Sequence, residues 1–445
     1  MKVELIETNS EEMEKLNDFL AKNEINIETF NELAKNINFS FSVEECSRLL
    51  SHHICESLDS YTQQSQRYVK MGENAFVLPD EIKNSDLEKE FVELTKELFE
   101  FYGKITQIKD GFAGRKASES DYVHGIKIED GRYILPLNTT TNILVTMNFS
   151  RIINFYNAIK RLKVKESEEL LKKIDSAVRK TKIVEFINKN IIQKEENIIG
   201  EYSKENFEKI SKENNCILIN SFKDPLLRSG LGALTSTNEL GASEIKKQWD
   251  ANNEASEKSK GVTARVIGYG HTSIIEHART NFGTTMSLTC YHQFERHRLQ
   301  CNVREQFEMI PITREMIIPP SVERNNEILA EFKQKVDKVK LLRQKLKENN
   351  LPQEYLLLNC DMLKLISSTN ARIDNDILSE RTCNNAQWEI RNLYIKKLEQ
   401  LKKLAPILYD NAGPGCTRGK CPEGTLTCGK ILEVREKFGY FGSNN

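Results

Sequence analysis

Apolar and polar positions change their spacing several times along the chain, and each change predicts a new element. The first forty residues place apolar positions at helical spacing among acidic ones. The segment NFSFSV (38–43) alternates with period two, which is typical of a strand, and EECSRLLSHHICESL (44–58) returns to helical period. DGRYILPL and TNILVTMNFSRIINFYNAI follow at 130–159, and the second is apolar at helical spacing, so we expect a helix there.

The pattern then changes to Lys, Glu, Ile and Asn without Gly or Pro from 160 to about 214, which predicts a helical connector solvated on one face. NCILINSFKDP (215–225) restarts with a strand, HARTNFGTTMS (277–287) alternates, and LTCYHQFERHRLQ resumes helical spacing. FKQKVDKVKLLRQKLKENN predicts an amphipathic helix. We therefore expect an α+β protein with a half at 1–160, a connector at 161–214 and a second half at 215–445.

The two halves are an internal repeat, because YLLLNCDMLKLISSTNARIDNDIL mirrors the 133–159 segment. Phe41 lies as far before Cys55 as Phe282 lies before Arg296. The same register places further residues of the two halves opposite each other: Ser65 and Gln306, Arg67 and Glu308, Arg132 and Glu354, Asn148 and Asn370. Each half keeps polar groups that the other has lost, so we interpret the chain as a duplication followed by division of labour.

The composition of the chain excludes several classes of function. The chain has 64 basic and 65 acidic residues, which argues against a bulk electrostatic attraction to nucleic acid polymers. We find no apolar run of about 18 residues and no signal-peptide pattern at the amino terminus, so we expect a cytoplasmic protein without membrane contact. The ten cysteines are scattered except in AGPGCTRGKCPEGTLTCGK. Neither gap between Cys416, Cys421 and Cys428 is the two-residue gap typical of zinc sites, which favours a compact reduced loop over zinc.

Several polar motifs remain. RHR (296–298) places two guanidinium groups and an imidazole together, and a Ser-x-Arg pair at Ser65 and Arg67 can hold a phosphate. No activating base or GxSxG turn surrounds Ser65, and neither a Rossmann nor a P-loop motif is present. Arginines on apolar helical segments, as in NAR (370–372) and ERTCNNAQWEIRN (380–392), are costly without an anionic partner.

Taken together, these motifs resemble those of the flavin-dependent (ThyX-type) thymidylate synthases. The carboxy-terminal half carries GHTSIIEH, QFERHR, NAR and RTCNNAQWEI, and the amino-terminal half carries SYTQQSQRY and RYILPL. The resemblance covers most of both halves, without the connector and the first 35 residues. It implies two ThyX-like mixed α/β domains in tandem that form a pseudo-dimer, and a homodimer of chains would then imitate the family's homotetramer.

The resemblance also implies a reaction and a set of residues. The family binds FAD, takes hydride from NADPH and moves a methylene group from methylenetetrahydrofolate to C5 of dUMP. FAD would be held by His271, Ser273, Glu276, Arg296, His297, Arg298, Asn370 and Arg372. Gln293 and Arg381 would contact dUMP from one side, and Gln63, Gln64, Ser65, Arg67 and Arg132 from the other. Ser65, Arg67, Arg132 and Arg381 would be the catalytic set.

The family's two nucleotide-binding sets come from different subunits, and here each half keeps one. Cys55, Glu56 and Ser57 stand in place of RHR in the amino-terminal half. One composite site per chain is implied. The acidic residue that usually precedes the family's serine by two positions is Gln63, which leaves open another pyrimidine nucleotide as substrate. A non-catalytic nucleotide-binding protein is the third hypothesis, although random decay would not make the losses reciprocal.

Overall fold

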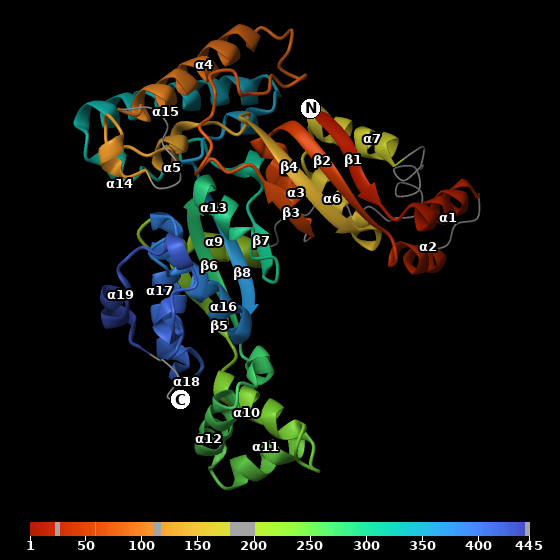
Figure 1. The fold of residues 1–445 in the computed structure, drawn as a ribbon, viewed down its shortest axis with the longest axis vertical. Coiled ribbons are helices and arrows are strands. Elements are labelled where there is room, and N and C mark those ends of the chain that lie inside the picture. Colours follow the sequence, from red (N-terminus) through yellow and green to blue (C-terminus); the bar gives the residue numbers. More distant parts are fainter. Residues whose placement is uncertain (23–26, 58, 110–116, 179–200, 441–445) are drawn as a thin grey trace. The chain divides into compact units, whose positions relative to one another are not determined.

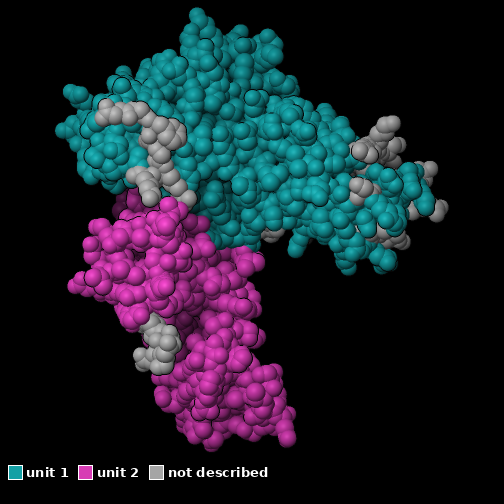
Figure 2. All heavy atoms as spheres, viewed as in Figure 1, with its two compact units in different colours: residues 1–198, 287–298, 306–362 teal, residues 199–286, 299–305, 363–445 magenta. Residues whose placement is uncertain are grey.

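The structure is a computed structural model that describes residues 1–22, 27–57, 59–109, 117–178 and 201–440. The chain divides into two compact units, drawn in different colours in Figure 2. Unit 1 comprises 1–198, 287–298 and 306–362, and unit 2 comprises 199–286, 299–305 and 363–445. Each unit is built on one four-stranded antiparallel sheet with helices, so the predicted α+β class is confirmed.

Unit 1 holds the sheet of the amino-terminal half, with strand order β1-β2-β4-β3 (Figure 1). Its strands are β1 Lys2–Thr8, β2 Asn38–Ser47, β3 Ser60–Gln63 and β4 Thr140–Asn148. The helices from the same half are α1 Ser10–Ala21, α2 Ile27–Ala34, α3 Arg48–Cys55, α4 Glu88–Ile105, α5 Ile128–Gly131, α6 Ile152–Arg161 and α7 Lys165–Ala177. The carboxy-terminal half adds α13 Leu288–Phe294, α14 Pro320–Glu323 and α15 Asn326–Glu348.

Unit 2 holds the second sheet, whose order β5-β6-β8-β7 repeats that of the first. Its strands are β5 Cys216–Ser221, β6 Arg279–Ser287, β7 Cys301–Arg304 and β8 Met362–Asn370. Its helices are α9 Glu201–Glu208, α10 Pro225–Thr235, α11 Ala242–Ala251, α12 Ala255–Gly268, α16 Ala371–Arg381, α17 Trp388–Leu404, α18 Pro406–Tyr409 and α19 Ile431–Phe438. The identical strand orders give the internal repeat a structural counterpart.

Two predictions from helical spacing are wrong. The first residues form strand β1, which pairs with β2 from Lys2 opposite Glu44 to Thr8 opposite Phe39. The 141–159 segment is strand β4 followed by α6, because β4 lies between β2 and β3 and buries alternate side chains. The break falls at Asn148, whose side chain accepts a hydrogen bond from the Ser150 N–H. An apolar segment that buries one sheet face can imitate helical spacing over so short a length.

Other predictions hold with shifted boundaries. NFSFSV lies in β2, NCILINSFKDP contains β5, HARTNFGTTMS contains β6, and the predicted amphipathic helix is the second part of α15. The helix predicted at 44–58 begins only at Arg48, because 44–47 remain in β2. Both described ends of the predicted connector are helical, in α7 and α9, and its middle, 179–200, lies outside the described residues.

Within unit 1, segments of the two halves meet through equivalent residues. Leu137 N–H donates to Leu357 O at 2.8 Å, and Asn359 N–H donates to Leu135 O at 2.9 Å. Pro136 and Leu358 form the bridge between them. Because Leu135 and Leu137 are the repeat equivalents of Leu357 and Asn359, the contact is reciprocal, as at the interface of a two-fold symmetric dimer.

Helices α4 and α15 extend this contact, and Figure 1 shows them side by side. Ion pairs join Glu90 to Lys345 at 2.7 Å and Lys104 to Glu331 at 2.6 Å. The buried rings of Phe101 and Phe332 pack edge to face between these helices. In the part of the chain that the structure describes, no helix is long and apolar enough to cross a membrane.

Gly131 allows a close approach just before the predicted site residue Arg132. A Cβ atom at Gly131 would lie 2.2 Å from Thr106 Cγ2, whereas a Cβ atom at Gly103 in α4 would meet nothing within 4 Å. We expect Gly131→Ala to destabilise the protein by about 1–3 kcal/mol through overpacking. Gly103→Ala should be neutral or stabilise by up to ~1 kcal/mol, because alanine favours helix. Thermal denaturation of both variants checks this, and an unchanged melting temperature for Gly131→Ala would contradict it.

Candidate nucleotide and flavin site

Two short helices of unit 1, α3 and α13, begin at equivalent serine caps. The Ser47 hydroxyl accepts a hydrogen bond from the Leu50 N–H, and the Ser287 hydroxyl accepts one from the Cys290 N–H, both at 3.0 Å. The backbone on either side also matches, since Arg48 N–H donates to Thr139 O and its equivalent Leu288 N–H donates to Asp361 O. Ser47 and Ser287 therefore occupy the same position in the repeat.

The register predicted for these helices is wrong by one residue. Aligned on their caps, α3 and α13 place Glu56, rather than Cys55, opposite Arg296. Glu56 and Ser57 therefore stand opposite the first two residues of RHR, and the third position, 58, lies outside the described residues.

A bulge in β2 causes this slip. The pairing of β2 with β4 shifts between Val43 and Cys46, and Glu45 adopts a left-handed backbone with φ of 56°. β2 consequently has ten residues where β6 has nine. One extra residue in a bulge leaves no mark in the hydrophobic pattern, so counting along the sequence carries the error into the next helix.

Three buried side chains of unit 1 present N–H groups that have no acceptor. Arg48, Gln66 and Arg132 are at most 4% exposed. Arg48 Nε, Gln66 Nε2 and Arg132 Nη2 lack a hydrogen-bond partner among the described residues. The Asn359 amide donates to both Gln66 Oε1 and Arg132 O, at 3.2 and 3.0 Å, so Gln66 and Arg132 are neighbours. Leaving buried donors unpaired costs about 1–3 kcal/mol each, which an oxyanion would remove.

The two buried arginines also oppose each other electrostatically. Burial, and after it the nearby charge of Arg132, lowers the pKa of Arg48 to about 9. Burial is the main cause that lowers the pKa of Arg132. Burial therefore outweighs the nearby carboxylates for each guanidinium, and the donor set fits a phosphate.

Gln293 on α13 differs from these donors because its side chain also offers an acceptor. Its side chain is 7% exposed, and neither its amide oxygen nor its amide nitrogen has a partner within the described part of the chain. It directly follows His292, whose ring bonds Arg48. A free donor beside a free acceptor is complementary to the imide edge of a uracil ring, which presents N3–H and C=O groups.

The Ser65 and Arg67 motif forms a turn in unit 1. The Ser65 hydroxyl accepts a hydrogen bond from the Arg67 N–H at 3.1 Å, and the Arg67 Nε donates to Glu129 Oε2 at 2.8 Å. Burial would raise the pKa of Glu129, but the charges of Arg67 and Arg132 outweigh it and lower this pKa. Glu129 thus holds Arg67 beside Arg132, whose own Nε donates to the Glu129 carbonyl at 3.0 Å.

The two glutamines before Ser65 are placed differently. Gln63 is buried, and its amide donates to the hydroxyls of Ser51 and Thr141 at 2.8 and 3.3 Å. Gln64 is half-buried, and its carbonyl oxygen accepts from Arg48 Nη2 at 2.8 Å. Gln63 therefore packs inside unit 1, whereas the backbone of Gln64 joins Arg48 to the Ser65 turn.

The RHR segment follows the end of α13 and also belongs to unit 1. Arg296 is exposed, and His297 is half-buried. The Arg298 guanidinium lies 4.3 Å from the Tyr61 ring centroid and donates to the Tyr61 carbonyl at 3.4 Å. Its Nε is buried without a partner in the described ranges. Arg298 is therefore oriented by Tyr61 and keeps one donor for a ligand.

The remaining predicted residues lie in unit 2. His271 and Ser273 are exposed around the turn Thr272–His277. Arg372 Nη1 donates to Glu276 Oε1 at 2.6 Å, and both side chains are nearly half exposed. The Asn370 side chain caps α16 by accepting from the Arg372 and Ile373 N–H groups. Arg372 and the Ser273 hydroxyl can contact an anionic group of a dinucleotide such as FAD, and Glu276 holds Arg372 in place.

Arg381 is the last residue of α16 in unit 2. Its Nη2 lies 3.8 Å from Oε2 of the neighbouring Glu380. Unit 1 thus gathers Gln293, Arg298, Arg67 and Arg132 from the predicted nucleotide and flavin sets. Unit 2 gathers Glu276 with Arg372.

The equivalent positions in the carboxy-terminal half carry the opposite charge. Glu308 and Glu354 stand where the amino-terminal half has Arg67 and Arg132. Burial, followed by the charges of Glu308 and Glu81, raises the pKa of Glu354 to about 7. Two carboxylates in place of two guanidiniums repel a phosphate, so this reciprocal location does not suit a nucleotide.

The three cysteines of the loop lie near one another, since burial and, after it, the charges of Cys421 and Cys428 raise the pKa of Cys416. Cys416 is buried, Cys421 and Cys428 are half-buried, and all three are free thiols. In the described residues, one group of three possible metal ligands lies within 4.8 Å, and it consists of His52, His292 and Glu295.

Sequence reasoning missed Arg48 and Gln66. Gln66 lies inside the quoted motif SYTQQSQRY, so its place between Ser65 and Arg67 was a signal. Arg48 lies outside the motifs, in a helix predicted as part of the fold. It is the one arginine in EECSRLLSHHICESL, and this was its only mark.

Comparison with known proteins identifies the family. The family model for thymidylate synthase complementing protein matches residues 3–181 and 218–407, so the chain belongs to this family. It is 32% identical over 196 residues to the flavin-dependent thymidylate synthase of Clostridium tetani, covering 39% of this chain and 78% of the relative. It is 30% identical over 231 residues to the enzyme of that name from Geobacter sulfurreducens, covering 50% and 96%. The corresponding Thermococcus kodakarensis protein is 35% identical over 176 residues, covering 36% and 72%.

The raised pKa of Glu354 predicts a pH-dependent stability. An unfolded glutamic acid loses its proton near pH ~4.3. Glu354 keeps its proton in the folded state up to a pH of about 7, so its contribution to stability is present below pH ~4.3 and is lost as pH rises through 7. Glu354→Gln should therefore stabilise the protein at pH 7.5 by about 1–3 kcal/mol and have little effect at pH 4. Urea denaturation at both pH values measures this.

Exposed Glu100 on α4 supplies the control, because Glu100→Gln should change stability little at either pH. Equal stabilisation by Glu354→Gln at both pH values would contradict the assigned titration.

Proposed function

We propose that this protein is a flavin-dependent thymidylate synthase. It would transfer the methylene group of methylenetetrahydrofolate to C5 of dUMP, with FAD as cofactor and NADPH as source of the hydride. The observation that carries the proposal is the pair of buried donors at Gln66 and Arg132, which have no partner among the described residues, in a chain of this family. Buried donors are normally paired with an acceptor, and these donors suit an anionic ligand.

The two halves of the chain would form a pseudo-dimer with one composite site. Ser65, Arg67 and Arg132 of the amino-terminal half would hold the nucleotide phosphate, and Gln293 of the carboxy-terminal half would bind the base edge. Arg381 would also contact the nucleotide. The reversed charges at Glu308 and Glu354 support a single site per chain, since they oppose phosphate at the reciprocal location.

Flavin binding would be assigned to the carboxy-terminal half. Arg296, His297 and Arg298 supply donors after α13, and His271, Ser273, Glu276, Asn370 and Arg372 supply a polar surface around the start of α16. When bound, FAD provides the redox chemistry that the side chains of the chain lack. The chain's own residues would orient the nucleotide, neutralise its phosphate and exclude water from the base.

Little supports the hypothesis that another pyrimidine nucleotide is the substrate. The hypothesis depended on Gln63, and the Gln63 amide donates to Ser51 and Thr141 inside unit 1. Gln293 offers the donor and acceptor that an imide edge requires. A cytosine edge would also satisfy this amide, so the preference for a uracil nucleotide rests on the family to which the chain belongs. The proposed assembly is a homodimer of chains, which would contain four ThyX-like halves.

The proposed cofactor gives the first functional test. Purified protein should be yellow, with about one FAD per chain, because RHR occurs once. Arg296→Ala together with Arg298→Ala should strip the flavin, since each charge-assisted contact is worth ~1.5–3 kcal/mol. Visible absorbance after gel filtration measures the bound flavin, and exposed Arg161 on α6 gives the control variant Arg161→Ala. Full flavin content in the double variant would refute the assignment.

A second test concerns the composite site. Arg67→Ala and Arg132→Ala should each weaken dUMP binding by ~2–5 kcal/mol while FAD stays bound, because an anionic partner loses its contact. Arg381→Ala should weaken the same nucleotide. Calorimetric titration with dUMP and flavin absorbance give the two readings.

Mixing the inactive Arg67→Ala and Arg381→Ala chains then locates the site. If the two halves of one chain build it, the mixture stays inactive, and if halves of different chains build it, activity partly returns. A separate fragment 215–445 that methylates dUMP at the full rate would refute the composite site.

A further inference from the structure

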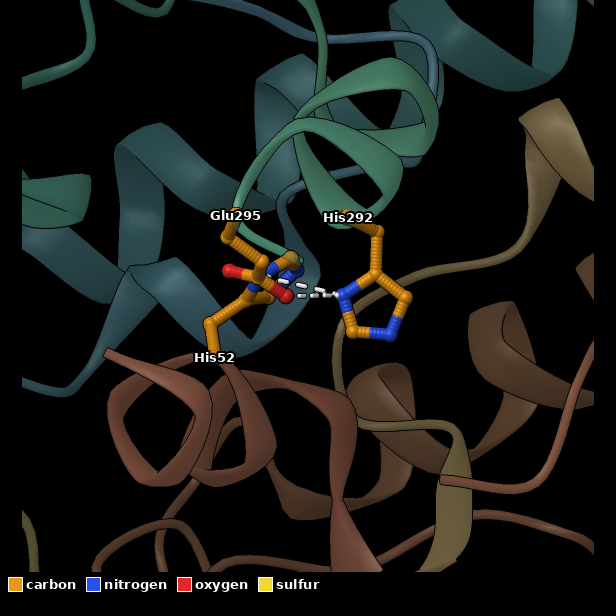
Figure 3. Close-up of side chains that lie close together, drawn as sticks. All are labelled: His52, His292 and Glu295. Atoms are coloured by element: carbon orange, nitrogen blue, oxygen red, sulfur yellow. Dashed lines mark hydrogen bonds and ion pairs between the residues drawn. The ribbon is translucent and has the colours of Figure 1, made fainter. Parts of the chain in front are cut away.

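A buried cluster joins α3 and α13 inside unit 1. His52 comes from α3, His292 lies on α13 and Glu295 directly follows its end, and Figure 3 shows the three side chains facing one another. Glu295 Oε2 lies 3.1 Å from His52 Nδ1, and Glu295 Oε1 lies 2.6 Å from His292 Nδ1. The carboxylate therefore faces both imidazoles and can accept a hydrogen bond from His52 Nδ1. The two imidazoles also face each other, with His292 Nδ1 at 3.3 Å from His52 Nδ1.

Arg48 fixes the proton on one of these rings. Arg48 Nη1 lies 2.7 Å from His292 Nε2, and a guanidinium can only donate, so His292 Nε2 accepts. Burial, followed by the positive charges of His52 and Arg48, lowers the pKa of His292 well below its usual value. The neutral ring must then carry its proton on Nδ1, which lies 2.6 Å from Glu295 Oε1 and 3.3 Å from His52 Nδ1. The result is a chain of contacts from His52 through Glu295 and His292 to Arg48.

The cluster is better explained by shared protons than by a metal ion. His292 Nδ1 would have to give up its proton to a metal while Nε2 still faces the Arg48 donor. Arg48, Arg132 and Arg296 all act on His292 as positive neighbours. A divalent cation would be repelled by these charges, whereas hydrogen bonds among two imidazoles and one carboxylate are not.

Arg48 occupies a position that is unfavourable for a cation. It is the first residue of α3, where the helix dipole is positive, and it is 2% exposed. Its contacts are a neutral imidazole and the Gln64 carbonyl, and its Nε is unpaired within the described residues. Arg132 adds a second positive charge nearby. All of these costs would be relieved by one anion.

Among the described residues the cluster occurs once, because the repeat is not symmetric. With α3 and α13 aligned on their caps, His52 is the equivalent of His292, but Arg48 is the equivalent of Leu288, and Glu295 of Cys55. Two copies of the carboxy-terminal half would bury two carboxylates together, and two copies of the amino-terminal half would have none. The cluster thus favours pairing of one half with the other.

We propose that Arg48 binds the phosphate of the nucleotide and that His292 and Glu295 are positioning residues that hold its guanidinium. The inference rests on the proposed function. The unpaired groups of Arg48, Gln66 and Arg132 are all donors, which suits phosphate oxygens, whereas a base edge would also need an acceptor. Gln64 supports the placement, since its carbonyl joins Arg48 to the turn that carries Ser65.

The test compares dUMP with deoxyuridine, which lacks the phosphate, on the full-length flavin-loaded protein. Arg48→Met should weaken dUMP binding about 30-fold or more, because a charge-assisted contact is lost, and leave deoxyuridine binding unchanged. Inorganic phosphate should compete with dUMP on the wild type and much less on the variant. His53→Gln is the matched control, because His53 is buried on the same helix and its ring faces the Leu49 carbonyl, outside the cluster.

The outcomes separate this inference from the proposed function. A folded Arg48→Met variant that binds dUMP as well as the wild type overturns the inference alone. An equal loss for dUMP and deoxyuridine overturns the assignment to phosphate. A wild type that binds neither FAD nor dUMP overturns the proposed function itself.

A double-mutant cycle tests the positioning role. Glu295→Gln should weaken dUMP binding about three- to tenfold in the wild type and not further in Arg48→Met, because it acts through Arg48. An equal loss in both backgrounds would show a merely structural role and overturn the positioning. Stoichiometric zinc in the purified wild type that is lost in Glu295→Gln would overturn the shared-proton arrangement.

Discussion

The reciprocal backbone contact around Pro136 and Leu358 is the constraint on which unit 1 depends. It joins equivalent segments of the two halves, as a two-fold dimer interface joins two subunits, but within one chain. Arg132 precedes this contact by a few residues and Asn359 follows it, so the contact fixes the buried arginine relative to its neighbours. Helices α3 and α13 are tied to the same segments through Leu137 and Asn359, which places their polar residues against each other.

Fusion of two copies allows the two sides of this contact to diverge. In a symmetric dimer every charge near the axis occurs twice, so a buried carboxylate would face its own copy. Here Glu295 faces two imidazoles, and Arg48 has Leu288 as its equivalent. The same freedom explains the reversal from Arg67 and Arg132 to Glu308 and Glu354. A tandem chain can concentrate positive charge at one location and stabilise the other by different means.

In this protein, the buried polar groups indicate an anion site more clearly than the overall charge of the chain does. The net charge of the chain is near zero, and an anion site is invisible in composition. It becomes visible as guanidinium and amide groups that are removed from water and left without acceptors. Native proteins rarely tolerate such groups, so several of them together indicate a ligand that the fold is built to receive.

The sequence by itself determined the α+β class, the duplication, the family and most candidate residues, because these depend on residue types and spacings that survive in a linear pattern. It failed where three-dimensional pairing decides the conformation. A buried central strand imitates helical spacing in β4, and a single bulged residue at Glu45 shifts the following helix by one position. Only the tertiary structure decided that Gln63 bonds inward and that Arg48 lies buried beside His292 near Arg132, because these contacts join residues far apart in the chain.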